Sequence, residues 1–167
     1  GSHGTLGVLT EVTFKVLPRP AKAATLAFDG LTDARAVDLL CQAMGTPFEP
    51  TGAAHLPAHG RGLTVLRLEG FDENILYRSG ELKKRLAGFG VGRLIEGAAH
   101  ETLWRDIRDA VPVATPADRA VWRLSVSAPK GAVVVQAIKM VIPDAVHYFD
   151  WAGGLIWVSV PEANDAG

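Results

Sequence analysis

The first hundred residues switch repeatedly between a strand period of two and a helix period of 3.6 in their apolar positions. Gly45 ends the first helical stretch, and Ile75, Leu82 and Leu86 form the apolar stripe of the second. The predicted elements are a strand at 23–28, a helix at 32–44, strands at 53–56 and 63–68, a helix at 72–88 and a strand at 93–96. This βαββαβ order predicts a ferredoxin-like unit, in which two helices pack on one face of an antiparallel sheet.

The remaining sequence predicts a connecting helix and a shorter repeat of the same order. The connecting helix is expected at 99–110, and the polar, Pro-containing residues 113–118 form a surface linker. After the linker we expect a strand at 122–126, a helix at 129–140, and a hairpin of 146–151 and 155–160 whose Gly153-Gly154 pair suits a primed turn. This βαββ order predicts a second ferredoxin-like unit without its last helix and strand, with residues 162–167 as a cut end. Such a unit leaves a sheet edge open, so we expect self-association.

Residues 4–18 open the chain with a Gly-rich turn and a strand-like alternation. Gly4 and Gly7 have no Cβ, so the backbone there could approach a flat ligand or a pyrophosphate closely. Residues 8–17 then show the period-two pattern of a half-buried strand, which Pro18 ends. On the pattern alone, a plain β-turn before an edge strand explains these residues equally well.

Two longer strings make the opening more specific than its glycines do. They are Gly4-Thr5-Leu6-Gly7-Val8-Leu9-Thr10-Glu11 and Lys15-Val16-Leu17-Pro18-Arg19-Pro20. Together they resemble the closing segment of the flavin-binding domain in FAD-linked oxidases of the vanillyl-alcohol oxidase type. Four later blocks follow in chain order: Leu66-Arg67-Leu68-Glu69-Gly70, Leu103-Trp104-Arg105-Asp106-Ile107-Arg108, Trp122-Arg123-Leu124-Ser125-Val126 and Asp150-Trp151-Ala152-Gly153-Gly154-Leu155. Through these blocks, nearly the whole chain is similar to the FAD-binding subunits of bacterial glycolate oxidases.

The resemblance implies that the opening contacts FAD, mainly through its backbone. The implied cofactor-binding residues are Gly4, Thr5, Leu6, Gly7, Val8 and Leu9. His3 departs from the family, because related 2-hydroxy-acid dehydrogenases often carry Glu at that place. The resemblance further implies that residues 1–20 end a flavin domain whose larger part lies upstream. Residues 21–111 and 112–167 would then be the first and the second, incomplete, α+β units of a cap over the flavin's reactive face.

By the same resemblance, the complete protein is a FAD-dependent oxidoreductase that acts on the CH–OH group of 2-hydroxy acids. Its complex would oxidise glycolate to glyoxylate and pass electrons through the flavin towards an iron–sulfur subunit. Catalytic His and Arg side chains are expected in the companion flavin subunit, so no catalytic residue is assigned to this chain. The chain alone is expected to be inactive and to bind no FAD with useful affinity, because it holds only part of a dinucleotide site.

Composition narrows the range of partners. The 167 residues carry 17 Lys and Arg against 18 Asp and Glu, a formal charge of −1, which disfavours a nucleic-acid partner. No apolar run approaches the ~20 residues of a membrane span, so membrane contact is expected only through partner subunits of a cytoplasmic protein. Cys41 is the only cysteine and shares an apolar helix stripe with Val37, Leu40 and Met44, which predicts a core residue in a reducing compartment.

The histidines give no strong chemical motif. His55 and His59 are four apart, a helical spacing for metal ligands, but Pro57 between them favours an irregular loop and disfavours a metal site. His100 is explained by capping or a surface contact, and His147 by a place in a sheet. There is no Ser-His-Asp pattern and no P-loop.

Four tryptophans, at positions 104, 122, 151 and 157, suit either an aromatic substrate pocket or the layer between helices and sheet. Packing is the simpler interpretation and predicts four largely buried indoles. Two other functional hypotheses remain open at this stage. One is a non-catalytic module that holds subunits of a flavin oxidoreductase together, and the other is a regulatory or RNA-binding ferredoxin-like domain, which the charge disfavours.

Overall fold

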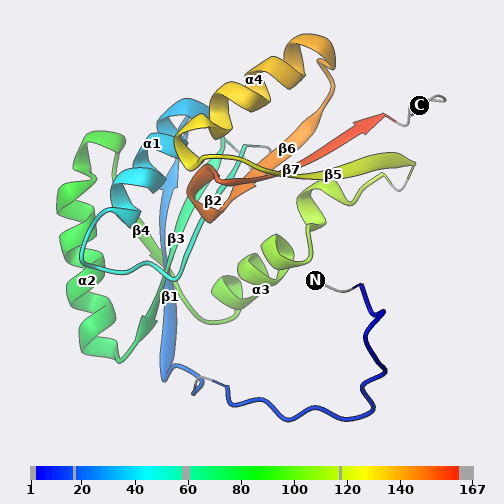
Figure 1. Cartoon of the computed structure of the whole chain (residues 1–167). Helices are drawn as coiled ribbons and strands as arrows, with labels where there is room; N and C mark the ends of the chain where they lie inside the picture. The colour runs from blue at the N-terminus through cyan, green and yellow to red at the C-terminus, as the bar shows by residue number, and fades with distance from the viewer. Residues whose placement is uncertain (1–2, 17, 58–60, 117, 162–167) are drawn as a thin grey trace.

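Seven strands form one antiparallel sheet in the order β4-β1-β3-β2-β6-β7-β5 (Figure 1). The computed structural model describes residues 3–16, 18–57, 61–116 and 118–161. The expectations for Leu17, His59 and the cut end at 162–167 therefore lie outside the described residues.

The first half of the fold has the predicted βαββαβ order. Its elements are β1 (Lys22–Asp29), α1 (Asp33–Met44), β2 (Gly52–Leu56), β3 (Leu63–Gly70), α2 (Asp72–Arg85) and β4 (Arg93–Ile95). Thr32 caps α1 through its hydroxyl, which accepts a hydrogen bond from the amide of Arg35. The second helix ends at Arg85, earlier than predicted, because a short 3-10 turn follows at Ala87–Phe89. The strand order β4-β1-β3-β2 confirms a ferredoxin-like unit.

In its described residues, the second half repeats the first four of these elements. A connecting helix, α3 (Gly97–Arg108), leads to β5 (Arg119–Ser125), α4 (Gly131–Val141), β6 (Val146–Asp150) and β7 (Leu155–Pro161). The strand order β6-β7-β5 matches β2-β3-β1 of the first half. The predicted βαββ order of the second α+β unit is therefore present in residues 119–161.

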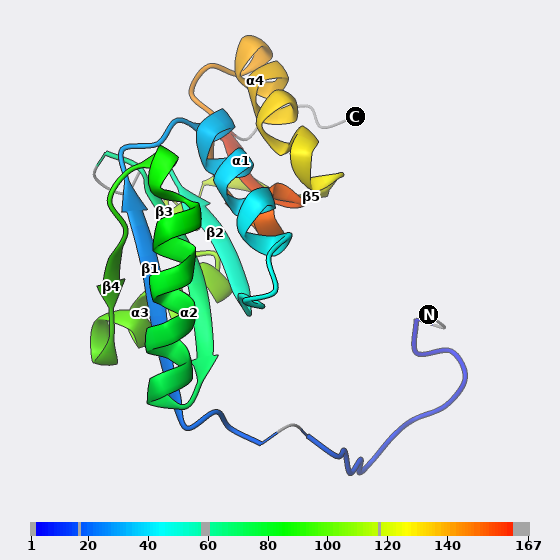
Figure 2. The same cartoon turned by 90° about the vertical axis from the view of Figure 1, so that its left-hand side faces the viewer.

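The two halves share a single sheet, whereas the sequence predicted a separate sheet for each. Strands β2 and β6 pair antiparallel where His55 lies opposite Phe149. Helices α1, α2 and α4 cover one face of this sheet, and α3 lies against the other (Figures 1 and 2). Only the connecting helix departs from the expectation that helices pack on one face.

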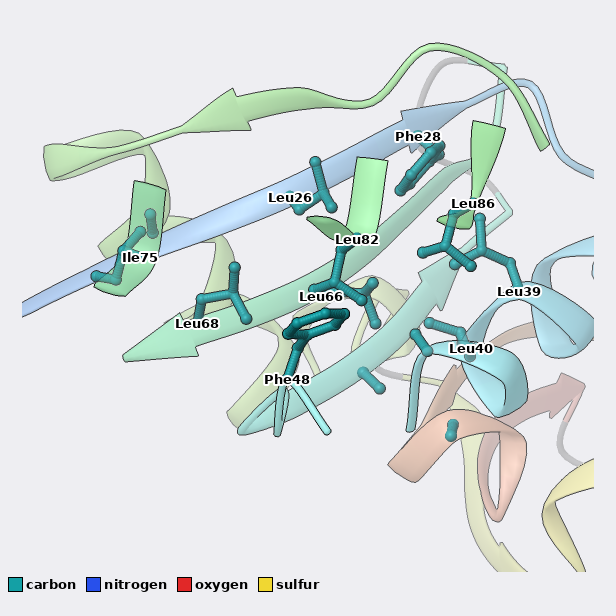
Figure 3. Close-up of a cluster of buried hydrophobic side chains, with 14 residues drawn as sticks. Leu26, Phe28, Leu39, Leu40, Phe48, Leu66, Leu68, Ile75, Leu82 and Leu86 are labelled. Atoms are coloured by element: carbon teal, nitrogen blue, oxygen red, sulfur yellow. The ribbon is translucent and has the colours of Figure 1, made fainter. Parts of the chain in front are cut away.

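The core of the first half lies between the sheet and helices α1 and α2. Figure 3 shows Leu26 and Leu66 of the strands facing Leu40 of α1 and Leu82 of α2. All four side chains are buried. This contact follows from the helical stripes that the sequence predicts.

The predicted N-terminal strand is absent from the described part of residues 8–17. Residues 5–16 have no helix or strand assignment, and Leu6, Val8 and Phe14 are exposed. In Figure 1 this segment runs as an extended arm away from β1. Alternating residues form a half-buried strand only when a neighbouring strand supplies hydrogen bonds and a layer covers the apolar side. Neither is assigned to this arm.

Burial of the tryptophans and of Cys41 also differs from the expectation. Trp122 is 55% exposed and Trp151 60% exposed, while Trp104 and Trp157 are half-buried. Cys41 is half-buried as well, and its thiol donates to the carbonyl of Ala152 at 3.6 Å. The prediction of four largely buried indoles is therefore wrong for two of them. No described helix covers Trp122 on β5, and Trp151 lies in the turn between β6 and β7.

The β6–β7 hairpin is not closed by the predicted two-residue primed turn. A 3-10 turn at Trp151–Gly153 joins the strands, and Trp151, Ala152 and Gly153 all have positive φ, whereas Gly154 does not. A Cβ on Gly153 would come within 2.9 Å of the carbonyl oxygen of Ala128. Close packing and positive φ therefore both favour glycine at position 153.

Candidate functional site

A groove of about 970 Å³ lies on the sheet face beside α3. Both halves of the molecule line it, with Arg67 from β3, Trp104 from α3, and Arg123 and Trp157 from the second half. At its floor, a Cβ on Gly52 would come within 2.8 Å of the Trp104 ring. The indole therefore packs directly on the backbone of β2.

A buried threonine holds α3 against β1 at one side of the groove. The Thr25 hydroxyl accepts a hydrogen bond from Trp104 Nε1 at 2.8 Å and lies 2.8 Å from His100 Nδ1. One hydroxyl therefore bonds two side chains of α3 at once. Burial, together with the nearby Arg67 guanidinium, lowers the pKa of His100. The imidazole is thus held neutral and oriented.

Arg67 supplies the first cation of the groove. One terminal nitrogen pairs with the Glu69 carboxylate, and the guanidinium lies 5.9 Å from the centre of the Trp104 ring. Its Nε is buried and has no hydrogen-bond partner among the described residues. Buried polar atoms are satisfied in most proteins, so this guanidinium retains unused donor capacity.

Arg123 supplies the second cation. Its guanidinium lies 5.5 Å from the ring of Trp151 and 5.8 Å from that of Trp157. Trp157 in turn stacks on Tyr148, with 6.4 Å between ring centres and 9° between planes. The hydroxyl of Tyr148 donates to the carbonyl of Ile107 in α3. Aromatic faces therefore position Arg123, without a carboxylate partner among the contacts that the structure shows.

The groove is positively charged. Among the described residues that line it, three are acidic, Glu69, Glu101 and Asp150, and six are basic: Arg19, Lys22, Arg67, Arg105, Arg108 and Arg123. Burial raises the pKa of Asp150 above its usual range. A guanidinium can hold a carboxylate or phosphate with two parallel hydrogen bonds. This arrangement suits an anionic ligand.

The residues predicted to bind FAD do not line this groove. Gly4, Thr5, Leu6, Gly7, Val8 and Leu9 lie on the exposed arm, and only the arm's end reaches the groove, through Arg19 and Pro20. A Cβ on Gly4 or Gly7 would meet nothing within 4 Å, so the folded chain itself does not require glycine for space there. Their assignment as a flavin contact stays a prediction.

Sequence reasoning identified some of the groove and missed its two central cations. The sequence explains His100 by capping or a surface contact, but the side chain is buried and its Nδ1 lies 2.8 Å from the Thr25 hydroxyl. Trp104 and Trp157 belong to the four tryptophans discussed for an aromatic pocket, whereas Arg67 and Arg123 occur only inside the resemblance blocks. A signal was available, because each arginine interrupts an apolar run within a strand. Opposite sides of such a strand face different layers, so an arginine there marks the less covered side.

A second polar cluster joins the two halves on the helix-covered side. The Asp33 carboxylate, at the start of α1, accepts from His147 Nε2 at 2.9 Å and lies 3.4 Å from His55 Nε2. Both imidazoles are buried, and His55 Nδ1 bonds Thr64 Oγ1 at 2.9 Å. Burial raises the pKa of Asp33, but the contacts with His147 and His55 outweigh it and hold that pKa well below its usual range.

This cluster corrects the interpretation of His55. His55 lies inside β2, in agreement with the strand predicted at 53–56 and against the irregular loop that Pro57 suggested, and its ring stacks near Phe149. His147 occupies a buried place in β6, as expected. Asp33 is weakly basic because its pKa is depressed. The cluster therefore suits a structural role between the halves better than acid–base chemistry.

The described residues contain no group of three or more His, Cys, Asp or Glu side chains suited to hold a metal ion. None of the described helices combines the length and the apolar character that crossing a bilayer requires. No protein-family model matches the sequence, and no curated protein matches it significantly.

Proposed function

We propose that this chain is part of the FAD-binding subunit of a glycolate oxidase complex, and that the positively charged groove covers the reactive face of the flavin. The observation that carries the proposal is the pair of guanidiniums, Arg67 and Arg123, in one groove beside a neutral imidazole. The ordered blocks of sequence that resemble these subunits support the same assignment.

The chemistry of the groove suits a small 2-hydroxy acid. When bound, flavin supplies the hydride acceptor. Arg67 and Arg123 would bind the carboxylate of glycolate and orient it, because each has donors that no carboxylate of the fold fully occupies. The indoles of Trp104 and Trp157 would exclude water from the bound acid.

The proposal includes partners that this chain would need. An upstream flavin domain would hold most of the FAD, a companion flavin subunit would carry catalytic side chains, and an iron–sulfur subunit would accept electrons. The exposed arm with Gly4, Gly7 and Leu9 would complete the dinucleotide site against that flavin domain. In this arrangement the complex is cytoplasmic and contacts a membrane only through its partners.

The test uses the complete complex with Arg123 changed to Met, which keeps an unbranched apolar stem and removes the charge. We expect the KM for glycolate to rise at least tenfold, with flavin content unchanged. Arg93→Met is the matched control, because Arg93 pairs with Asp29 in β1 and does not line the groove. An unchanged KM in Arg123→Met, or an equal rise in the control, would contradict a carboxylate-binding groove.

A second candidate function is a non-catalytic module that holds subunits together. The observation that favours it is the set of exposed apolar side chains on β5 and α4, including Trp122 and Met140. Glycolate kinetics and the integrity of the complex, measured on the same two variants, distinguish the two functions. A groove mutation that leaves glycolate kinetics unchanged, while a mutation at Trp122 dissociates the complex, would favour the interaction module.

A further inference from the structure

The two edges of the sheet differ in how well they are protected. Strand β4 ends one edge and has only three residues, with Arg93 paired to Asp29. Strand β5 ends the other edge with seven residues, all of which pair with β7 on one side. Natural sheets usually blunt an edge with a very short strand, proline or charged side chains. Strand β4 is very short, whereas β5 is long and contains no proline, and its two arginines are engaged within the chain by Asp144 and by indole rings.

The side chains along β5 are also uncovered. Trp122 lies opposite Val158 and shares a face with Leu124, which packs with α4. In the first half, α2 covers the corresponding face of β1, but no described element takes its place over β5. Val121, on the opposite face, is exposed too. The edge therefore combines free backbone groups with an apolar surface.

We infer that β5 pairs antiparallel with β5 of a second copy of this chain, about a twofold axis at Trp122. This inference goes beyond the proposed function. Trp122 is the fourth of the seven residues in β5, so the twofold places it opposite itself. The same register sets Arg119 opposite Ser125 and Arg123 opposite Val121, so no like charges face each other.

Charge on the edge favours a second copy over an acidic partner. Arg119 is already engaged by Asp144 and by the Ser159 hydroxyl and carbonyl. Arg123 lies between two indoles on the groove side. Because both arginines already have contacts within the chain, neither indicates that an acidic strand of another protein pairs with β5. A twofold interface uses one surface twice, and in this register each arginine of β5 lies opposite an uncharged residue, so the edge is complementary to itself.

Cysteine cross-linking tests the register directly. In a Cys41→Ser background, Trp122→Cys would bring two thiols together at the twofold, because directly opposed residues of antiparallel strands have Cα atoms about 4.5 to 5.5 Å apart, within the range of a disulfide. We expect mild oxidation to convert most of this variant into a covalent dimer. Leu76→Cys is the matched control, because Leu76 is 70% exposed on α2 of the other half, and it should stay monomeric.

Light scattering during gel filtration tests the interface without a new thiol. The unmodified chain should elute as a dimer, and Trp122→Lys should elute as a folded monomer, because two lysines would oppose each other at the axis. Leu76→Lys should remain dimeric. A monomeric unmodified chain, or equal cross-linking of both cysteine variants, would overturn the inference. The free edge of β5 would then be available for pairing with a strand of another polypeptide.

Discussion

Three strands of each half follow the same order, β2-β3-β1 in the first and β6-β7-β5 in the second. The first strands of the two halves, β1 and β5, nevertheless differ in burial. Leu26 of β1 is fully buried, whereas Trp122 of β5 is 55% exposed. Helix α2 and strand β4 cover β1, and no described element does the same for β5. The elements that pack on a strand therefore decide whether its side chains are buried. A large aromatic side chain is not buried merely because it is apolar.

The largest effect is expected in the complete half. Leu26→Ala removes a buried side chain between β3 and α2 and should lower the free energy of unfolding by about 2 to 5 kcal/mol. Urea denaturation followed by circular dichroism measures it. If Leu26→Ala lowered the free energy of unfolding no more than the substitution of an exposed residue does, the first half would not have a closely packed core.

A smaller loss is expected at the junction of the halves. Asp33→Asn weakens the charged hydrogen bond with His147 and should cost about 1.5 to 3 kcal/mol at neutral pH. The folded state depresses the pKa of Asp33, so its stabilisation is present above the unfolded pKa, about 3.9, and is lost as pH falls through the lower folded pKa.

Urea denaturation of Asp33→Asn and the unmodified chain at a series of pH values checks this sign. The difference between them should be full near neutral pH and should shrink below about pH 4. A difference that grows as the solution becomes more acidic would contradict the assigned charge state of the cluster.

Trp122→Ala should have a much smaller effect than Leu26→Ala. A fully buried tryptophan would lose about 3 to 5 kcal/mol, but Trp122 is more than half exposed, so we expect a loss below about 1 kcal/mol in the monomer. The measurement is urea denaturation at low protein concentration, where dimerisation is weakest. A large loss under those conditions would mean that another part of the chain covers β5.

The smallest effect on stability is expected in the N-terminal arm. Gly7→Val should leave the unfolding midpoint of this chain unchanged, because a Cβ there meets nothing within 4 Å. In the complete subunit, the same change should reduce the ratio of flavin to protein after gel filtration, since a side chain would intrude on the cofactor. Unchanged flavin content would contradict the role proposed for the arm.

The sequence predicted the elements well where local pattern and tertiary packing agree. Ile75 and Leu82 are buried on α2 and Leu86 is buried directly after its end, as the predicted stripe requires. The strands around Leu66 and Ile156 lie where alternation and apolar runs place them. The ferredoxin-like order followed from these elements alone. Local periodicity is reliable here because each element buries one continuous side.

The candidate groove could not be predicted in the same way. Arg67 and Arg123 come from different halves and meet only because β2 pairs with β6 and makes one sheet of two units. Nothing in the local pattern of His55 or Phe149 encodes that pairing. The Asp33 cluster depends on the same join, since its two imidazoles come from β2 and β6.

The sequence by itself determined the types of element, their order and the helical stripes, because hydrophobic periodicity acts within a few residues of chain. The tertiary structure decided which apolar residues are buried and which charges share a groove. Those outcomes depend on contacts between distant segments, as the exposed arm at residues 5–16 and the uncovered Trp122 show. A strand-like pattern becomes a buried strand only where another element supplies the partner and the cover.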